Sequence, residues 1–249
     1  MILYFTGTGN SRWIAEQLAE ATQDTAVGMA DCLRRHAMPE GLSEAERVGV
    51  VFPVHSWYAP RVVVDFLMRI RLPRCRYRYA VCTCGDDAGK CMTRLAAHFP
   101  LDAAWSATMP NTYIPMFELD SDRLCRQKVE EARRLVAFMA GEVLQQKRVW
   151  KVHEGSAAWL KTYLINPLSV RFIIRSSGFR VESGCVSCGT CGASCPVGNI
   201  RMEAGRPVWG EHCIHCMACV HACPRKVIQY GRNTWKKGRY RLSDYLGKR

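Results

Sequence analysis

Long hydrophobic runs are missing from this sequence of 249 residues. No uninterrupted apolar stretch reaches the ~18 residues of a membrane-spanning helix. The longest candidate, residues 159–174, is interrupted by Lys161, Asn166, Pro167 and Arg171. The first residues also lack the charged and apolar regions of a secretory signal peptide. We therefore expect no transmembrane segment and a cytoplasmic location.

Acidic residues are scarce in the C-terminal part of the chain. Residues 147–249 carry 5 Asp and Glu against 18 Lys and Arg, whereas residues 1–146 carry 17 of each, so the formal charge of +13 lies in the C-terminal part. Basic and aromatic residues alternate in residues 232–242, as in some nucleic-acid-binding segments. Because no known nucleic-acid-binding module accompanies them, we do not expect nucleic acid as a partner.

The two common nucleotide-binding fingerprints are also absent. There is no Gly-Lys-Ser/Thr sequence, and Arg12 stands where the dinucleotide fingerprint requires a small residue. An apolar stretch at residues 1–5 is nevertheless followed by a glycine- and hydroxyl-rich loop and then by a helical pattern. Such a loop favours a monophosphate held by amides and hydroxyls at a helix N-terminus, although it can also be a purely structural turn. Its residues are Thr6, Gly7, Thr8, Gly9, Asn10 and Ser11.

Cysteine, by contrast, is abundant, and eight of the 14 cysteines form two runs with the same spacing, each ending in Cys-Pro. This C-x2-C-x2-C-x3-C-P spacing is the bacterial 4Fe-4S pattern, in which the fourth cysteine of each run ligates the other cluster. Zinc also accepts four thiolates, but it requires neither the third nor the proline-flanked cysteine. We therefore predict two 4Fe-4S clusters, one on Cys185, Cys188, Cys191 and Cys223, and the other on Cys213, Cys216, Cys219 and Cys195.

Several other residues with metal-binding side chains carry weaker signals. The histidines among the ligands, His212, His215 and His221, are expected at the surface or as donors to cluster sulfur. Cys82, Cys84 and Cys91 lie close together in the sequence, but packing is the expected role of Cys82, and a third metal site is the less favoured alternative. So many thiolates committed to clusters favour a reducing compartment.

The pattern of the first 146 residues predicts an α/β fold. Apolar strand candidates occupy residues 1–5, 25–29, 47–52, 77–83 and 103–109, and helical patterns occupy residues 11–21, 60–70, 89–99 and 121–146. Residues 31–45 are expected to be a short helix or irregular. Alternation of this kind predicts a doubly wound, five-stranded parallel sheet covered by helices on both faces.

The first and last parts of the chain together resemble a known family. The Thr6 to Ser11 loop after an N-terminal strand is similar to the FMN phosphate loop of flavodoxins, and its fusion to a two-cluster ferredoxin resembles the EFR-type ferredoxins. The segments at residues 52–60, 82–89 and 109–116 also match that pattern. The resemblance covers nearly the whole chain and implies a flavodoxin-like domain, FMN, and electron transfer through the clusters. It does not imply a substrate.

In a flavodoxin-like sheet the ligand lies beyond the carboxyl ends of the strands, where the strand order reverses. The loops after the first, third and fourth strands should therefore meet there. Trp57 and Tyr58 are candidates to stack on a flavin ring or merely to cover the sheet edge, and Asp86 and Asp87 are candidates to bond the ring or ribityl chain or only to cap a turn. His55 is a less favoured candidate for proton transfer. The FMN contacts expected besides the phosphate loop are Pro53, Val54, His55, Ser56, Trp57, Tyr58, Cys84, Gly85, Asp86, Asp87 and Gly89.

Four regions follow from these patterns: an FMN-binding domain at residues 1–146, a basic and partly helical linker at 147–180, a small α+β ferredoxin domain at 181–230 and a basic tail at 231–249. We expect the linker to dock the two domains, although its apolar residues would also suit an interfacial helix. The expected function is electron transfer between FMN, the two clusters and an acidic redox protein attracted by the basic half. The alternatives are a redox-responsive binding protein with a scaffold domain and a flavin-dependent reductase of a small molecule. Whether the chain is an enzyme, and its oligomeric state, stay open.

Overall fold

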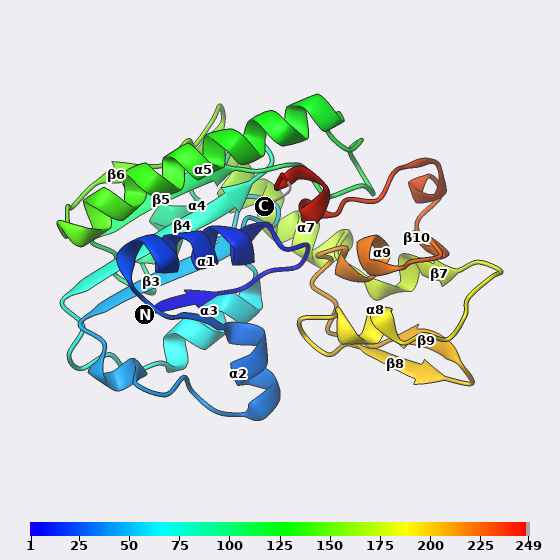
Figure 1. Ribbon diagram of the computed structural model, residues 1–249. Helices are drawn as coiled ribbons and strands as arrows, with labels where there is room; N and C mark the ends of the chain where they lie inside the picture. The colour runs from blue at the N-terminus through cyan, green and yellow to red at the C-terminus, as the bar shows by residue number, and fades with distance from the viewer. Residues whose placement is uncertain (248–249) are drawn as a thin grey trace.

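The computed structural model describes residues 1–247, which form an α/β domain and a smaller cysteine-rich domain side by side (Figure 1). The large sheet has the order β2-β1-β3-β4-β5-β6, and all its pairings are parallel. Its strands are β1 (Ile2–Tyr4), β2 (Ala26–Gly28), β3 (Arg47–Pro53), β4 (Tyr77–Cys84), β5 (Ala103–Thr108) and β6 (Trp150–Lys151). The strand order reverses between β1 and β3, as in a flavodoxin-like fold. The predicted fold class is therefore confirmed.

Two apolar cores, one on each face of the sheet, hold the helices. The first core combines side chains of α1 (Asn10–Thr22) and α5 (Asp122–Leu144) with one face of the strands, including the fully buried Trp105. The second core combines α2 (Met29–Arg35), α3 (Arg61–Arg69) and α4 (Cys91–Ala96) with the other face. Ser121 caps α5 as expected, because its hydroxyl accepts a hydrogen bond from the Leu124 amide. Residues 31–45 hold the end of α2 and a 3-10 turn, η1 (Leu42–Glu44).

The sheet has six strands rather than the five that the sequence predicts. The additional strand, β6, is two residues long and lies at the edge beside β5. Lys151 extends from it to Glu142 on α5 at 2.9 Å, and Glu142 also accepts a hydrogen bond from the buried indole of Trp105. Two residues show no alternating pattern, so the sequence could not identify this strand.

The segment after β6 is helical and leads to the small domain. It consists of α6 (Ala158–Leu160), a π-helical stretch η2 (Lys161–Ile165) and α7 (Asn166–Phe172). The small domain has a 3-10 turn η3 (Ser176–Gly178) and two antiparallel pairs: β7 (Phe179–Val181) with β10 (Ile228–Tyr230), and β8 (Ile200–Glu203) with β9 (Arg206–Trp209). Between them lie α8 (Thr190–Ala193) and α9 (Ala218–Ala222). No helix within residues 1–247 is long and apolar enough to cross a bilayer.

The C-terminal tail returns to the α/β domain and does not extend into solvent. After η4 (Thr234–Lys236), Tyr240 and Leu242 are buried in the core shared by α1 and α5, and η5 (Leu242–Tyr245) lies against α5. Figure 1 shows this red segment reaching back between the two domains. The tail therefore connects the two domains a second time; the last two residues of the predicted tail lie outside the described residues.

Candidate metal centres and ligand crevice

The eight cysteines of the two runs line two separate cavities. Site I, of about 330 Å³ including its open mouth, is lined by Cys185, Cys188, Cys191 and Cys223. Site II, of about 300 Å³, is lined by Cys195, Cys213, Cys216 and Cys219. These are the two sets that the sequence assigns to separate clusters, with Cys195 and Cys223 each crossing to the other run's site. The structure thus brings together the donors of two 4Fe-4S cubes.

A single metal ion suits this arrangement less well. Within the described residues, no three His, Cys, Asp or Glu side chains approach closely enough to hold one ion. The cysteines instead surround cavities, as a polynuclear cluster requires. This observation favours iron-sulfur clusters over the zinc alternative.

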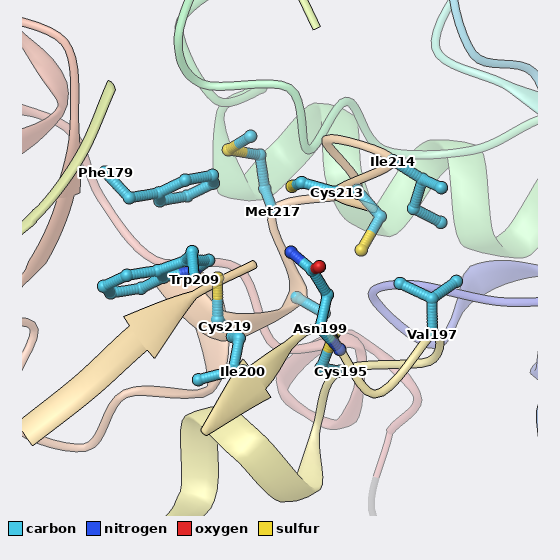
Figure 2. A pocket seen from close by; sticks show the side chains of 12 residues that line it. Phe179, Cys195, Val197, Asn199, Ile200, Trp209, Cys213, Ile214, Met217 and Cys219 are labelled. Carbon is cyan, nitrogen blue, oxygen red and sulfur yellow. Dashed lines mark hydrogen bonds between the residues drawn. The ribbon is translucent and has the colours of Figure 1, made fainter. Parts of the chain in front are cut away.

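Site II is enclosed by aromatic and amide groups (Figure 2). Phe179 and Trp209 stack with ring centroids 5.1 Å apart and line the cavity. The amide of Asn199 donates to the sulfur of Cys195 at 3.2 Å, and the amide of His215 donates to that of Cys213 at 3.4 Å. Such donors stabilise negative charge on cluster sulfur. The buried indole nitrogen of Trp209 has no hydrogen-bond partner within residues 1–247, so it is free to donate into this site.

The two sites differ in their exposure. Cys188 in site I is exposed, and hydrogen bonding with the Thr190 hydroxyl lowers the pKa of its thiol. In site II, burial raises the pKa of Cys216 to about 12. Site I therefore has an exposed cysteine, and none of the four cysteines of site II is exposed.

The Thr6 to Ser11 loop begins helix α1 and has an unusual backbone. Gly9, at φ 101°, is the N-cap of α1 and provides no side-chain cap, which leaves the helix N-terminus open to an anion. The loop hydroxyls already have protein partners. Thr6 accepts from the Gly9 amide at 3.1 Å, Thr8 donates to Thr112 at 3.3 Å, and Ser11 bonds Thr83 at 2.8 Å.

Site II lies directly against this loop. A Cβ placed on Gly7 would be 2.8 Å from the Cβ of Cys216, so no larger residue fits there without a shift. Asn10 is buried and donates to the Pro110 carbonyl at 3.1 Å, and it accepts a hydrogen bond from the Tyr240 hydroxyl at 2.8 Å. The loop therefore contacts the cysteine-rich domain and the tail at once.

The expected ring-binding side chains are held by the helical linker. Asp87 accepts hydrogen bonds from the Trp57 indole at 2.8 Å and from the Lys161 ammonium at 2.6 Å. Tyr58 is 9% exposed, and the Arg94 guanidinium lies 3.9 Å from its ring centroid. A cation therefore lies near each ring, because the Lys161 ammonium is 5.5 Å from the Trp57 ring centroid. Asp86 is exposed and Asp87 is not.

The loop after β3 turns sharply and brings His55 to the domain interface. Residues 55–58 close a small antiparallel bridge, with Ser56 at φ 50° and Trp57 at φ 61°. Burial and, to a smaller extent, nearby His215 together lower the pKa of His55 to about 4, so the imidazole is neutral near pH 7. Pro53 ends β3, and the Val54 amide donates to the Thr83 carbonyl at 2.8 Å.

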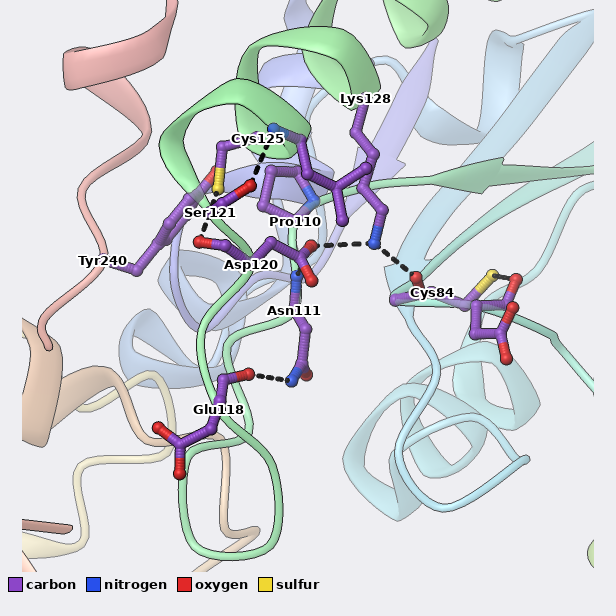
Figure 3. A network of polar contacts seen from close by, with 12 residues as sticks. Cys84, Pro110, Asn111, Glu118, Asp120, Ser121, Cys125, Lys128 and Tyr240 are labelled. Atoms are coloured by element: carbon purple, nitrogen blue, oxygen red, sulfur yellow. Dashed lines mark hydrogen bonds and ion pairs between the residues drawn. The ribbon is translucent and has the colours of Figure 1, made fainter. Parts of the chain in front are cut away.

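The loops after β4 and β5 are joined by Lys128 of α5 (Figure 3). Its ammonium donates to the Gly85 carbonyl at 2.8 Å and to Asp120 at 2.7 Å, and Asp120 accepts the Asn111 amide at 3.0 Å. Cys84, just before Gly85, is buried, and burial raises the pKa of its thiol to about 12. Gly89, at φ 57°, lies against Trp57 and Thr162. These contacts fix the loops after β4 and β5 relative to α5.

Cys82 and Cys91 are fully buried in the second core. Burial raises the pKa of both thiols well above the usual value, so they stay protonated and pack as apolar groups. Together with Cys84 they form no site for a single ion within the described residues. Packing, the role expected for Cys82, agrees with its position.

Two of the histidines among the ligands are buried, and the amide of His215 donates to the sulfur of Cys213. The expectation of a surface position is wrong for His215 and His221, which are 3% and 4% exposed. His215 bonds the Tyr113 hydroxyl at 2.7 Å. His221 donates to the Thr112 carbonyl at 2.8 Å and accepts the Tyr240 amide at 3.0 Å. They connect segments more than 15 residues apart, a relationship that no local pattern reveals.

Comparison with known proteins identifies the cysteine-rich part. Residues 184–228 match the 4Fe-4S dicluster domain family. A stretch of 49 residues is 43% identical to one subunit of the ion-translocating oxidoreductase complex of Methanosarcina acetivorans. This match covers 19% of the chain and about a fifth of the length of that curated relative (19%).

Solved structures similar to this chain cover about half of it. A putative flavoprotein from Bacteroides uniformis superimposes with a TM-score of 0.38 at 16% identity, covering 43% of this chain and 88% of that one. The Trp repressor binding protein from Bacillus subtilis superimposes with a TM-score of 0.36 at 14% identity, covering 54% of this chain and 96% of that one. An NAD(P)H:quinone oxidoreductase from Methanothermobacter marburgensis superimposes with a TM-score of 0.34 at 13% identity, covering 55% of this chain and 94% of that one. The sheet order and the family match together establish a flavodoxin-like domain fused to a two-cluster 4Fe-4S ferredoxin domain.

Proposed function

We propose that this chain is an electron-transfer protein of the EFR-type ferredoxin kind, in which FMN bound at the Thr6 to Ser11 loop exchanges electrons with the two clusters. The observation that carries the proposal is the contact between Gly7 of this loop and Cys216 of site II. A phosphate-binding loop in contact with a cluster ligand keeps the distance between the two redox groups short.

The residues of the crevice fit FMN at its phosphate end. The uncapped N-terminus of α1 and the backbone of Gly7 and Gly9 would hold the phosphate, as at other helix N-termini. Trp57 would lie against the ring, and Asp87, which is ion-paired with Lys161, would lie beside it. FMN, when bound, supplies two-electron chemistry and can exchange electrons singly with the clusters.

The surroundings of site I and site II differ, and this difference favours one order of electron transfer. Cys216 of site II lies against Gly7 of the loop, and Cys188 of site I is exposed. We propose that electrons pass between the crevice and site II, then site I, and from there to an acidic redox protein attracted by the basic half. The Thr6, Thr8 and Ser11 hydroxyls would have to exchange protein partners for phosphate oxygens when FMN binds.

Anaerobic purification with iron, sulfide and flavin quantification tests the proposal. We expect about eight irons and one FMN per chain, with both absorption spectra bleaching on reduction by dithionite. Stopped-flow reduction of the flavin should be followed by one-electron reduction of the clusters in the same chain. Eight irons without flavin, and none bound when FMN is added, would contradict the FMN role and leave the α/β domain as a scaffold.

A further inference from the structure

The helical segment formed by α6, η2 and α7 has its polar side facing inward. The residues that it buries are Ala158, Thr162, Asn166 and Ser169, which recur at helical spacing. Thr162 accepts the Lys90 amide at 2.9 Å and donates to the Trp57 carbonyl at 3.2 Å. Arg94 of α4 donates to Asn166 at 2.9 Å. Hydrogen bonds therefore hold this segment on the α/β domain, where an ordinary surface helix would use apolar packing.

Its outward side is apolar to an unusual degree. Nine large apolar side chains between residues 159 and 173 are at least 36% exposed, and Trp159 reaches 64%. They are Trp159, Leu160, Tyr163, Leu164, Ile165, Leu168, Val170, Phe172 and Ile173. We call these residues the apolar ridge. A contiguous exposed apolar surface of this kind is typical of a site that binds a membrane or another molecule.

The charges around the apolar ridge are of one sign. Residues 155–181 contain no Asp or Glu, but they contain Lys161, Arg171, Arg175 and Arg180. Acids of the adjoining segments are already paired: Asp87 with Lys161, Glu154 with Lys90 and Glu182 with Arg180. Nothing on this surface repels an anionic partner, and the exposed arginines attract one.

Aromatic rings of the apolar ridge have cations beside them. The rings of Trp159 and Tyr163 lie 5.6 Å apart, the Arg94 guanidinium is 5.9 Å from the Tyr163 ring, and Arg171 is 5.5 Å from the Phe172 ring. Aromatic side chains with adjacent Lys and Arg are typical of the headgroup region of bilayers. A helix with a broad apolar side and flanking cations lies in the plane of that region.

We propose that the apolar ridge docks this protein on the surface of an anionic lipid bilayer, with the helix parallel to the membrane and Arg171 and Arg175 among the headgroups. A lipid surface fits better than an acidic protein, because the outward side is almost wholly apolar and its cations lie at the end of the helix. The docking brings the Trp57 edge of the crevice near the bilayer, since Thr162 contacts the Trp57 carbonyl. The proposal stands on the described surface alone and does not require FMN.

Vesicle flotation with the anaerobically purified, full-length holoprotein tests this docking. We expect the protein to float with vesicles that contain phosphatidylglycerol and to remain largely unbound with phosphatidylcholine alone. Added salt should reduce binding, because screening weakens the contribution of the arginines. The Arg171→Gln, Arg175→Gln variant should partition roughly tenfold less, while Arg61→Gln, Arg148→Gln, with charges removed elsewhere, should bind as the wild type.

A second pair of variants tests the apolar contribution. The triple variant Trp159→Ser, Leu164→Ser, Leu168→Ser changes exposed side chains only, and it should lose flotation without losing iron. Met38→Ser, Met68→Ser, Leu144→Ser removes equally exposed side chains elsewhere and should float normally. Absence of wild-type flotation, or equal flotation of both triple variants, would overturn the proposal. So would light scattering that shows a lipid-free dimer which only the Trp159-containing triple variant disrupts, because a second copy would then cover the ridge.

Discussion

At the scale of single residues, the indole of Trp209 is a hydrogen-bond donor that lines site II. Its nitrogen is buried beside site II and has no hydrogen-bond partner within the described residues. A donor aimed at cluster sulfur stabilises the more negative, reduced state and so raises the reduction potential. Trp209→Phe should therefore make the potential of one cluster more negative and leave the other unchanged.

A redox titration followed by electron paramagnetic resonance measures both clusters separately. Trp235→Phe, at a 57% exposed position, is the control and should shift neither potential. Two unchanged potentials in Trp209→Phe would show that the indole does not reach the cluster.

Gly7 provides a second test at this scale, because a Cβ at this position would lie 2.8 Å from Cys216. Gly7→Ala should destabilise the contact between the domains by about 1–3 kcal/mol, the usual range for overpacking. We expect a lower melting temperature and faster proteolysis between the domains. Gly141→Ala is the control, since nothing lies within 4 Å of a Cβ there, and an alanine inside α5 should stabilise slightly. Equal melting temperatures for the two variants would count against close contact of the loop with site II.

At the scale of elements, the linker segment depends on one buried hydroxyl. Thr162 is fully buried and accepts the Lys90 amide while donating to the Trp57 carbonyl. Thr162→Val keeps the shape but leaves both backbone groups unsatisfied, which costs about 1–3 kcal/mol for each buried group. The segment at residues 158–172 should then detach more often and be cleaved first in limited proteolysis, as mass spectrometry of the fragments would show. The control Thr25→Val, at an exposed position, should leave the order of cleavage unchanged. An unchanged order of cleavage in Thr162→Val would show that its hydroxyl does not hold the segment.

The elements also show what the sequence could predict and what it could not. Strands β3 and β4 are long apolar runs, and the cysteine spacing is a local pattern, so both were found. Strand β6 is too short to carry a pattern, and the burial of Tyr240 depends on Asn10, 230 positions away. The surroundings of Trp57 and Tyr58 were only partly predicted, because Arg94 reaches Tyr58 from α4 and Lys161 reaches Asp87 from the linker. No local sequence pattern fixes either contact.

At the scale of the whole molecule, the two domains derive their stability from different sources. The α/β domain has two extended apolar cores. The small domain has a single, smaller apolar core, which includes iron-sulfur ligands such as Cys191, Cys219 and Cys223. A domain of that size with so small a core generally needs its metal to stay folded. Because Ile114 of the α/β domain and Tyr240 of the tail are buried at the junction, loss of the clusters should also loosen both of these segments.

Anaerobic removal of iron with a chelator, followed by hydrogen exchange, tests this division. We expect residues 179–230 to lose protection, the loop around Ile114 and the tail around Tyr240 to exchange faster, and strands β1 and β3 to β5 to keep their protection. The physical reason is that sites I and II, once empty, leave four cysteines around each cavity with little apolar packing to replace the cluster. Reconstitution with iron and sulfide should restore the protection of all three regions together. Protection that survives iron removal in residues 179–230 would mean that the tail and linker alone hold the small domain in place, and the dependence of its fold on the clusters would be refuted.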